Sequence, residues 1–227
     1  MKIALISDIH ANIDALETML KRLESERIDK TVCLGDIVGY GAKPEECVSL
    51  VRKHCDVCIM GNHDAALAGI IQLQYFNAYA RSAIEWSQKV MSEDNMDFLR
   101  ALPMRYEIED VLLVHATPKD PSAWNYVHTM EDALPNFEAM NPATACFIGH
   151  SHLPVRFDSE DKSQMIVNVG SIGQPRDRDP RASCGLYDTE TREFKWIREA
   201  YDVQKAAQRI RDADLPEFLA SRLFIGM

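Results

Sequence analysis

The chain has 227 residues, a formal net charge of −10, 46% hydrophobic residues and 26% charged residues. This length suits one well-buried domain, and we expect a single domain over residues 1–227. The negative charge argues against an extensive nucleic-acid surface, because proteins that bind phosphate backbones collect Lys and Arg on one face. No apolar run is long enough to cross a bilayer, and no signal peptide begins the chain, so we expect a cytoplasmic protein with no membrane partner.

Residues 1–60 alternate apolar strands with amphipathic helices. The patterns predict strands at 2–7, 31–34 and 57–60, and helices at 11–27 and from 44 to about 52. Pro44 suits the first turn of its helix, and the following Glu45 and Glu46 favour the helix dipole. Strands and helices that alternate with short connections predict a parallel sheet covered by helices.

Residues 65–102 show two helical patterns and no convincing strand. Ser92 or Asp94 is a plausible cap of the second helix, and Pro103 ends it. A helical insertion between two strands that carry site residues is equally consistent with a lid over the site and with cover for a sheet edge.

From residue 104 the pattern predicts mainly strands. Residues 105–108 and 111–114 read as a hairpin, 116–126 as a long loop, and a helix follows around 130–137. The C-terminal part is helical from about 203 to 223, with an interruption at Pro216. The remaining strands are expected at 145–148, 154–157, 164–169, 184–188 and 193–197.

Five apolar runs end in residues of the kinds that ligate metals. These endings are Asp8-Ile9-His10, Gly35-Asp36, Gly61-Asn62-His63-Asp64, His115 and Gly149-His150-Ser151-His152. In open α/β sheets ligands bind at the carboxyl ends of the strands, where these residues would meet. Asp, Asn and His together favour Mn, Fe, Zn or Ni over Mg or Ca, which prefer shells made only of oxygen. Two such ions about 3.5–4 Å apart suit in-line attack on phosphorus.

As an ordered set, these motifs resemble the calcineurin-like metallophosphoesterase superfamily, from residue 3 to about residue 188. Segments 7–12, 35–41 and 170–176 are most similar to small bacterial and archaeal phosphodiesterases related to diadenosine tetraphosphatase or to serine/threonine phosphatases. The resemblance implies an α/β fold, a four-layer α/β/β/α sandwich of two mixed sheets flanked by helices.

The resemblance also implies a site for two divalent metal ions, manganese in the first place, with iron, zinc or nickel as alternatives. The implied ligands are Asp8, His10 and His152 for the first ion, Asn62, His115 and His150 for the second, and Asp36 as a bridge between them. His63 is implied as the general acid or transition-state stabiliser, with Asp64 behind it to orient the ring.

Several nearby residues are open to two interpretations. Arg176 could clamp a phosphate together with Arg178 and Arg181, or the three could lie in a salt-bridged surface loop with Asp177 and Asp179.

The aromatic residues Tyr40, Trp124 and Tyr126 are consistent with stacking on a nucleobase or with ordinary packing, and for Trp124 we favour packing. We also favour a supporting turn over a phosphate cradle at 170–173. His54 and His128 match no motif.

These features predict a dimetal-dependent phosphoesterase in which a metal-bridging hydroxide attacks phosphorus and His63 assists the leaving group. We expect a small phosphodiester or nucleotide as substrate, with Arg176 and Tyr40 as candidate contacts. The alternatives are a dinucleoside polyphosphate hydrolase, a protein phosphatase or, in a different class, a non-catalytic scaffold like the retromer subunit of this fold. A scaffold needs neither His63 nor the full ligand set, so their presence favours the enzyme.

Overall fold

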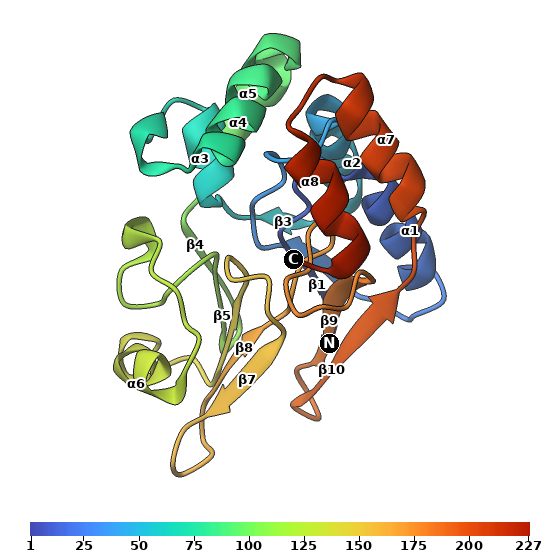
Figure 1. The fold of residues 1–227 in the computed structure, drawn as a ribbon. Helices are drawn as coiled ribbons and strands as arrows, with labels where there is room; N and C mark the ends of the chain where they lie inside the picture. Colours follow the sequence, from blue (N-terminus) through green and yellow to red (C-terminus); the bar gives the residue numbers. More distant parts are fainter.

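Two five-stranded sheets lie face to face, with helices on both outer sides, in the computed structural model, which describes residues 1–227 (Figure 1). The first sheet has the order β10-β9-β1-β2-β3 and the second β4-β5-β6-β8-β7. The strands of the first sheet are β1 (Lys2–Ile6), β2 (Lys30–Cys33), β3 (Val57–Cys58), β9 (Ala182–Asp188) and β10 (Glu193–Glu199). Those of the second are β4 (Arg105–Ile108), β5 (Val111–Val114), β6 (Ala145–Ile148), β7 (Val155–Asp158) and β8 (Met165–Asn168).

Helices cover the outer face of each sheet. They are α1 (Ile13–Leu23), α2 (Pro44–His54), α3 (Asn62–Leu67), α4 (Ala78–Val90), α5 (Glu93–Arg100), α6 (Met130–Ala139), α7 (Val203–Asp212) and α8 (Glu217–Ser221). Short 3₁₀ helices span Leu73–Tyr75, Pro121–Ala123 and Arg222–Ile225. Helices α1 and α2 pack on the first sheet, and α6 packs on the second. None of the helices is both long and apolar enough to span a membrane.

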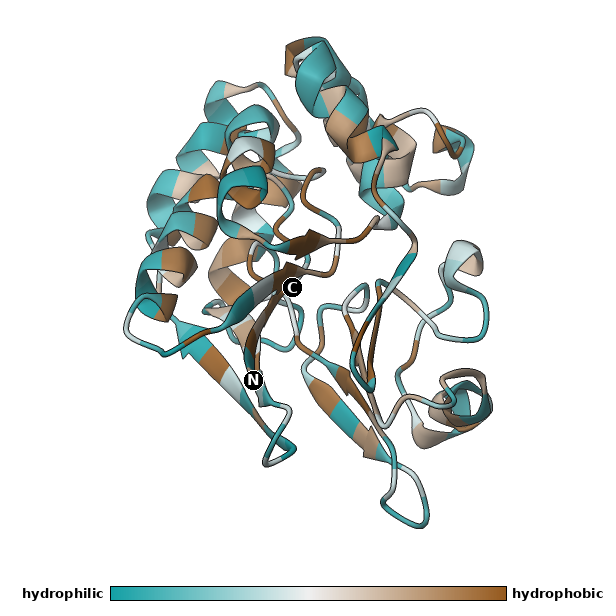
Figure 2. Cartoon of the chain, turned by 180° about the vertical axis from the view of Figure 1, so that it is seen from behind, coloured by the Kyte–Doolittle hydropathy of each residue, from teal (hydrophilic) through white to brown (hydrophobic).

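The alternation of side-chain direction along the strands explains the layers. In β1, Ile3 and Leu5 face the core between the sheets, whereas Ala4 and Ile6 face the helices. Because successive strand residues point to opposite faces, a strand buried on both sides must be apolar throughout. The hydropathy colouring shows this, with brown strands inside and teal outer faces on the helices (Figure 2). The expected arrangement of two mixed sheets flanked by helices is confirmed.

Parallel strands bring the motifs to one edge of the sandwich. β1, β2 and β3 run parallel in the first sheet, and β5, β6 and β8 run parallel in the second. The segments that follow these strands leave each sheet at one edge, and all five motifs lie in them; residues from the two sheets meet there, since Asp36 lies with His115 and His150.

The region around β3 differs from the prediction of a strand at 57–60. The strand has only two residues, and on its far side the Met60 amide donates to the Pro103 carbonyl at 2.8 Å. A helix, α3, then begins directly in the Gly-Asn-His-Asp motif, and the sequence patterns did not predict it. The two helices expected within 65–102 are present as α4 and α5.

Replacing Leu113 by Ala tests the core between the sheets. Leu113 is fully buried there, so the substitution should lower the free energy of unfolding by about 2–5 kcal/mol. The matched change Leu134→Ala on α6, where the side chain is 61% exposed, should alter it by about 0.5 kcal/mol or less. Urea unfolding of both variants measures the difference, and equal effects would contradict the assigned core.

Candidate metal centre

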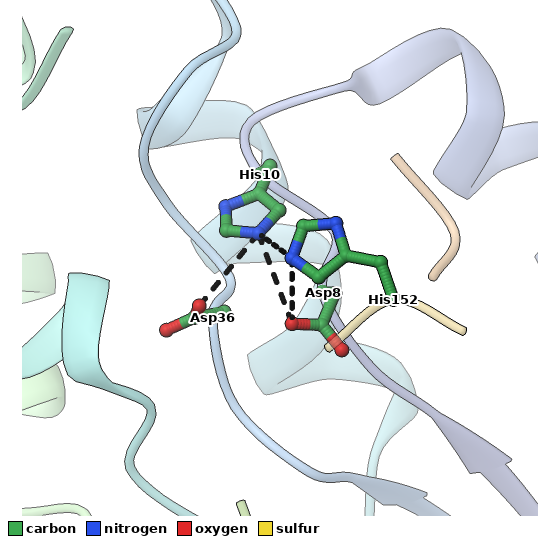
Figure 3. A group of neighbouring side chains, drawn as sticks. All are labelled: Asp8, His10, Asp36 and His152. Carbon is green, nitrogen blue, oxygen red and sulfur yellow. Dashed lines mark hydrogen bonds and ion pairs between the residues drawn. The ribbon is translucent and has the colours of Figure 1, made fainter. Parts of the chain in front are cut away.

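The side chains that follow the parallel strands converge on two adjoining clusters. In the first, ligand atoms of Asp8, His10, Asp36 and His152 all lie within 4.8 Å of one another (Figure 3). In the second, Asp36, His115 and His150 meet the same limit. All six residues are buried, and Asp36 belongs to both clusters, as a residue that bridges two ions must.

The backbone at these residues adopts an uncommon conformation. Left-handed φ values of 52°, 50°, 53°, 66° and 61° occur at Asp8, His10, Asp36, His150 and His152. This region is unfavourable for residues with a Cβ atom, and such strain concentrates at functional sites. Each strand-end loop therefore turns sharply, and this turns the ligand side chains toward one point.

The lone-pair nitrogens of the His10 and His152 rings point toward each other. Nδ1 of His10 lies 3.0 Å from the Val38 carbonyl oxygen, and Nδ1 of His152 lies 2.6 Å from that of Gln174. Because a carbonyl oxygen only accepts, both Nδ1 atoms carry the proton, and in the neutral rings both Nε2 atoms present lone pairs. These Nε2 atoms are 3.0 Å apart. Their lone pairs repel each other unless a shared cation or proton lies between them.

The other two imidazoles are oriented in the same way. His115 donates from Nδ1 to the Leu34 carbonyl at 2.7 Å and turns Nε2 toward Asp36 Oδ2, 3.4 Å away. His150 donates from Nε2 to the Trp124 carbonyl at 2.8 Å, which leaves Nδ1 as its lone-pair atom. Donation of the second ring N–H to a carbonyl is the usual support of a metal-bound histidine. The residues present therefore fit a metal centre.

The two buried carboxylates keep their negative charge. Burial by itself would raise the pKa of Asp8, but His152 and His115 hold that pKa below its usual range. The pKa of Asp36 is lowered in the same way, against burial, chiefly by His115. In return, although burial opposes it, Asp36 raises the pKa of His115 to about 9. The centre therefore attracts positive charge, as protons or as metal ions.

Asn62 lies in the first turn of α3 and offers a free oxygen. Its Oδ1 is buried and accepts no hydrogen bond from the protein, a costly state for an amide oxygen. The side chain borders the same cavity as His150. This is the environment that a ligand of the second ion requires, and the role of Asn62 stays a prediction.

Asp64 does not orient His63, and that prediction is wrong. Its Oδ1 accepts hydrogen bonds from the amides of Ile37 and Val38, at 2.9 and 3.3 Å, and its Oδ2 from the Gly61 amide at 3.0 Å. Asp64 caps α3 and ties that helix to the loop after β2. Burial, followed by the nearby Asp36, raises the pKa of Asp64 to about 7.

Packing holds the His63 ring instead. Its centroid lies 4.6 Å from the Tyr40 ring and 5.1 Å from the Phe76 ring. A Cβ at Gly39 would lie 2.3 Å from His63 Nδ1, so only glycine leaves room for the imidazole. Burial lowers the pKa of His63 to about 4.

One supporting residue was not recognised from the sequence. Asn168, at the end of β8, donates to the Gly149 carbonyl and, at 2.9 Å, to Ser151 Oγ. It thereby fixes the loop that carries both His150 and His152. An apolar run that ends in Asn was the available signal, since the ligand-bearing strands end in the same way.

The turn at 170–173 supports the site. Ser171 Oγ donates to the Asp8 carbonyl at 2.7 Å, and the Gly173 amide donates to the same oxygen at 2.9 Å. The Gln174 carbonyl in turn accepts from His152. Since these groups hold the ligand loops, the turn is not free to cradle a phosphate.

The three arginines at 176–181 do not all act alike: Arg176 is placed to meet a phosphate, and Arg181 belongs to a salt-bridged surface loop. Arg181 pairs with Asp179 at 2.7 Å, and Arg178 is exposed. Arg176 alone points to the site, with Nη2 2.8 Å from Gln174 Oε1 and 3.5 Å from the Tyr40 hydroxyl. His54 and His128 are both exposed, outside the two clusters.

Asp36→Asn should weaken both metal sites, because Asp36 is common to both clusters. Calorimetric titration of metal-stripped protein with Mn²⁺ should show at least about a 10-fold loss of affinity for each ion. The control Glu160→Gln changes an exposed carboxylate and should titrate like the unaltered protein. Undiminished binding in Asp36→Asn would refute the shared ligand.

Comparisons with known proteins agree with this geometry. Residues 1–192 match the calcineurin-like phosphoesterase superfamily domain. An uncharacterized protein from Methanocaldococcus jannaschii is 38% identical over 243 residues, which cover 99% of this chain and 98% of that protein.

Solved structures extend the likeness to the whole fold. The crystal structure of a metallophosphoesterase from Sphaerobacter thermophilus has a TM-score of 0.89 and 36% identity, and covers 100% of this chain and 99% of its own. A hypothetical protein from Pyrococcus horikoshii OT3, 21% identical, shares the fold with a TM-score of 0.87, over 100% of this chain and 98% of its own. The chain thus belongs to the calcineurin-like phosphoesterase superfamily of phosphoester hydrolases.

Proposed function

We propose that the protein is a metal-dependent phosphodiesterase acting on a small organic phosphodiester of the nucleotide type, with manganese as the first candidate for its metal. The observation that supports this most is a cavity of about 640 Å³ beside the metal centre. Asn62, His63 and His150 border it, so an ester bound there meets both the metal ligands and the candidate acid.

Aromatic side chains line the cavity. They are Tyr40, Tyr75, Phe76, Trp124 and Tyr126. The segment between α3 and α4 and the loop before α6 supply most of them. The volume is in the range of pockets for small organic ligands, and flat aromatic surfaces suit a nucleobase.

Hydrolysis adds a hydroxyl group to phosphorus and a proton to the leaving oxygen. Two bound divalent ions would supply an activated water and neutralise charge on the phosphate oxygens. His63 has no carboxylate partner, and its ring borders the cavity, so its N–H can donate a hydrogen bond that stabilises the departing oxygen. Tyr40 and Phe76 keep the ring in that position.

His63→Ala tests the catalytic assignment. Protein reconstituted with Mn²⁺ should hydrolyse bis(p-nitrophenyl) phosphate, and the variant should lose about 10²–10⁴-fold in kcat while it still binds metal. The control His54→Ala alters an exposed histidine of α2 and should keep full activity.

The matching monoester, p-nitrophenyl phosphate, defines the reaction class. Faster turnover of the monoester would contradict a phosphodiesterase and favour a phosphatase. Metal binding with no turnover of either ester would contradict the proposed reaction.

Tyr75→Ala tests the aromatic wall. Tyr75 is 78% exposed and borders the cavity, so it is available to stack on a ligand. Loss of one stacking partner should raise KM for the p-nitrophenyl ester of thymidine 5′-phosphate by about 5–100-fold. The control Tyr106→Ala removes a tyrosine of β4 that is 43% exposed and outside the cavity, and it should leave KM unchanged. Equal KM values in the two variants would refute the stacking role.

A further inference from the structure

Two arginines beside the metal centre lack a side-chain carboxylate partner. Most arginines of the chain form ion pairs. Those that form none are exposed, with the exceptions of Arg176 and Arg222, which are half-buried. Burying an unpaired charge is unfavourable unless an anion accompanies it. Arg222 has an oxygen of Met227 as one partner, but Arg176 has no anionic partner, so the pair of guanidinium groups favours an anionic ligand.

Both guanidinium groups lie around the same aromatic ring. The Cζ atoms of Arg176 and Arg222 are 5.8 and 5.9 Å from the centroid of the Tyr40 ring. That ring in turn lies 4.7 Å from His10 and 4.6 Å from His63. The arginine pair is thus only one aromatic ring away from the residues of the proposed reaction.

The existing contacts leave much of both groups free. The side chain of Arg176 contacts only Gln174 and Tyr40 by hydrogen bonds, and its buried Nε has no partner. Arg222 donates from Nε to the main-chain oxygen of Met227, and its two terminal nitrogens make no hydrogen bond. Burial and the charge of Arg176 lower the pKa of Arg222 to about 10. A bound anion would relieve this repulsion.

The C-terminal segment is built to hold Arg222 in place. Leu219 and Leu223, on either side of it in the chain, pack in one apolar cluster with Tyr40. The Arg178 amide donates to the Gly226 carbonyl at 2.9 Å, which joins the chain end to the loop that carries Arg176. The chain end lies near the carboxyl ends of the strands of the first sheet (Figure 1). Arg222 lies outside the family match of 1–192, so it does not belong to the part of the chain that defines the family.

We propose that Arg176 and Arg222 together bind a second phosphate group of the substrate, beside the phosphoryl group that is hydrolysed. Paired guanidinium groups offer several N–H donors in the flat geometry that phosphate oxygens accept. The preferred substrate then carries two phosphate groups, and the arginines select it by binding. This inference rests on the proposed phosphodiesterase function and names its substrate class.

Binding of nucleotides tests the arginine pair without relying on turnover. Calorimetric titration of the Mn²⁺-loaded protein compares thymidine 5′-monophosphate with thymidine 5′-diphosphate and thymidine 3′,5′-bisphosphate, which place the second phosphate at different distances. One of the two doubly phosphorylated ligands should bind about 10-fold or more tightly than the monophosphate.

Arg222→Gln should reduce that ratio of affinities to nearly one, and Arg222→Lys should restore part of it. The control Arg27→Gln alters an exposed arginine with no ion pair and should keep the full ratio. If Arg222 only stacks on Phe218, 5.1 Å from its ring centroid, Arg222→Gln would lower the melting temperature and leave the ratio intact.

Equal affinities for all three ligands in the unaltered protein, or an undiminished ratio in Arg222→Gln, would overturn the inference. Turnover of bis(p-nitrophenyl) phosphate, measured in parallel, shows separately whether the proposed hydrolysis takes place. A protein that fails to hydrolyse the diester but keeps the affinity ratio would refute the phosphodiesterase and retain the second phosphate site.

Discussion

The structure depends on the convergence of imidazole lone pairs and carboxylates in a buried space. Each of the four clustered histidines gives one ring proton to a carbonyl oxygen, so its other nitrogen must face the centre. The carboxylates of Asp8 and Asp36 add negative charge at the same place. The lone pairs and carboxylates repel one another unless protons or metal ions lie between them, so the fold has to hold these groups together.

Several local features of the chain follow from this crowding. The left-handed residues after the strands turn the ligands inward at a cost in backbone energy. A Cβ at Gly61 would lie 2.1 Å from Asp36 Oδ1, so the strand-end glycine is required for the close approach. The apolar core between the sheets keeps the strand ends in register while they carry this strain.

Functions are divided between the sheets and the segments added to them. The parallel strands position the candidate metal ligands, whereas the cavity wall comes from the segment before α4 and the loop before α6. Arg222 comes from the chain end. In the proposed function, the reaction takes place at the edge of the sheets, and the contacts that select the substrate come from the loops and the chain end around it.

The metal cluster was predictable because its signal is local. An apolar run that ends in Asp, Asn or His can be read directly from the sequence, and the parallel topology then brings such endings together. The direction in which a side chain points cannot be read from the local sequence in the same way. Asp64 follows His63 directly, yet the start of α3 directs its carboxylate to backbone amides rather than to the ring.

Arg222 was missed for a related reason. It follows no strand and lies 46 positions after Arg176, and only the packing of the C-terminal segment reveals its proximity to Tyr40. Tyr75 likewise becomes a candidate contact only because it borders the cavity. Such relations depend on tertiary contacts that no short pattern encodes.

Anomalous diffraction from crystals of the Mn²⁺-loaded protein would test the paired metal centre most directly. The account predicts two peaks about 3.5–4 Å apart, with Asp36 between them and Asn62 Oδ1 bound to the second ion. A single peak, or ions bound away from Asp36, would contradict it.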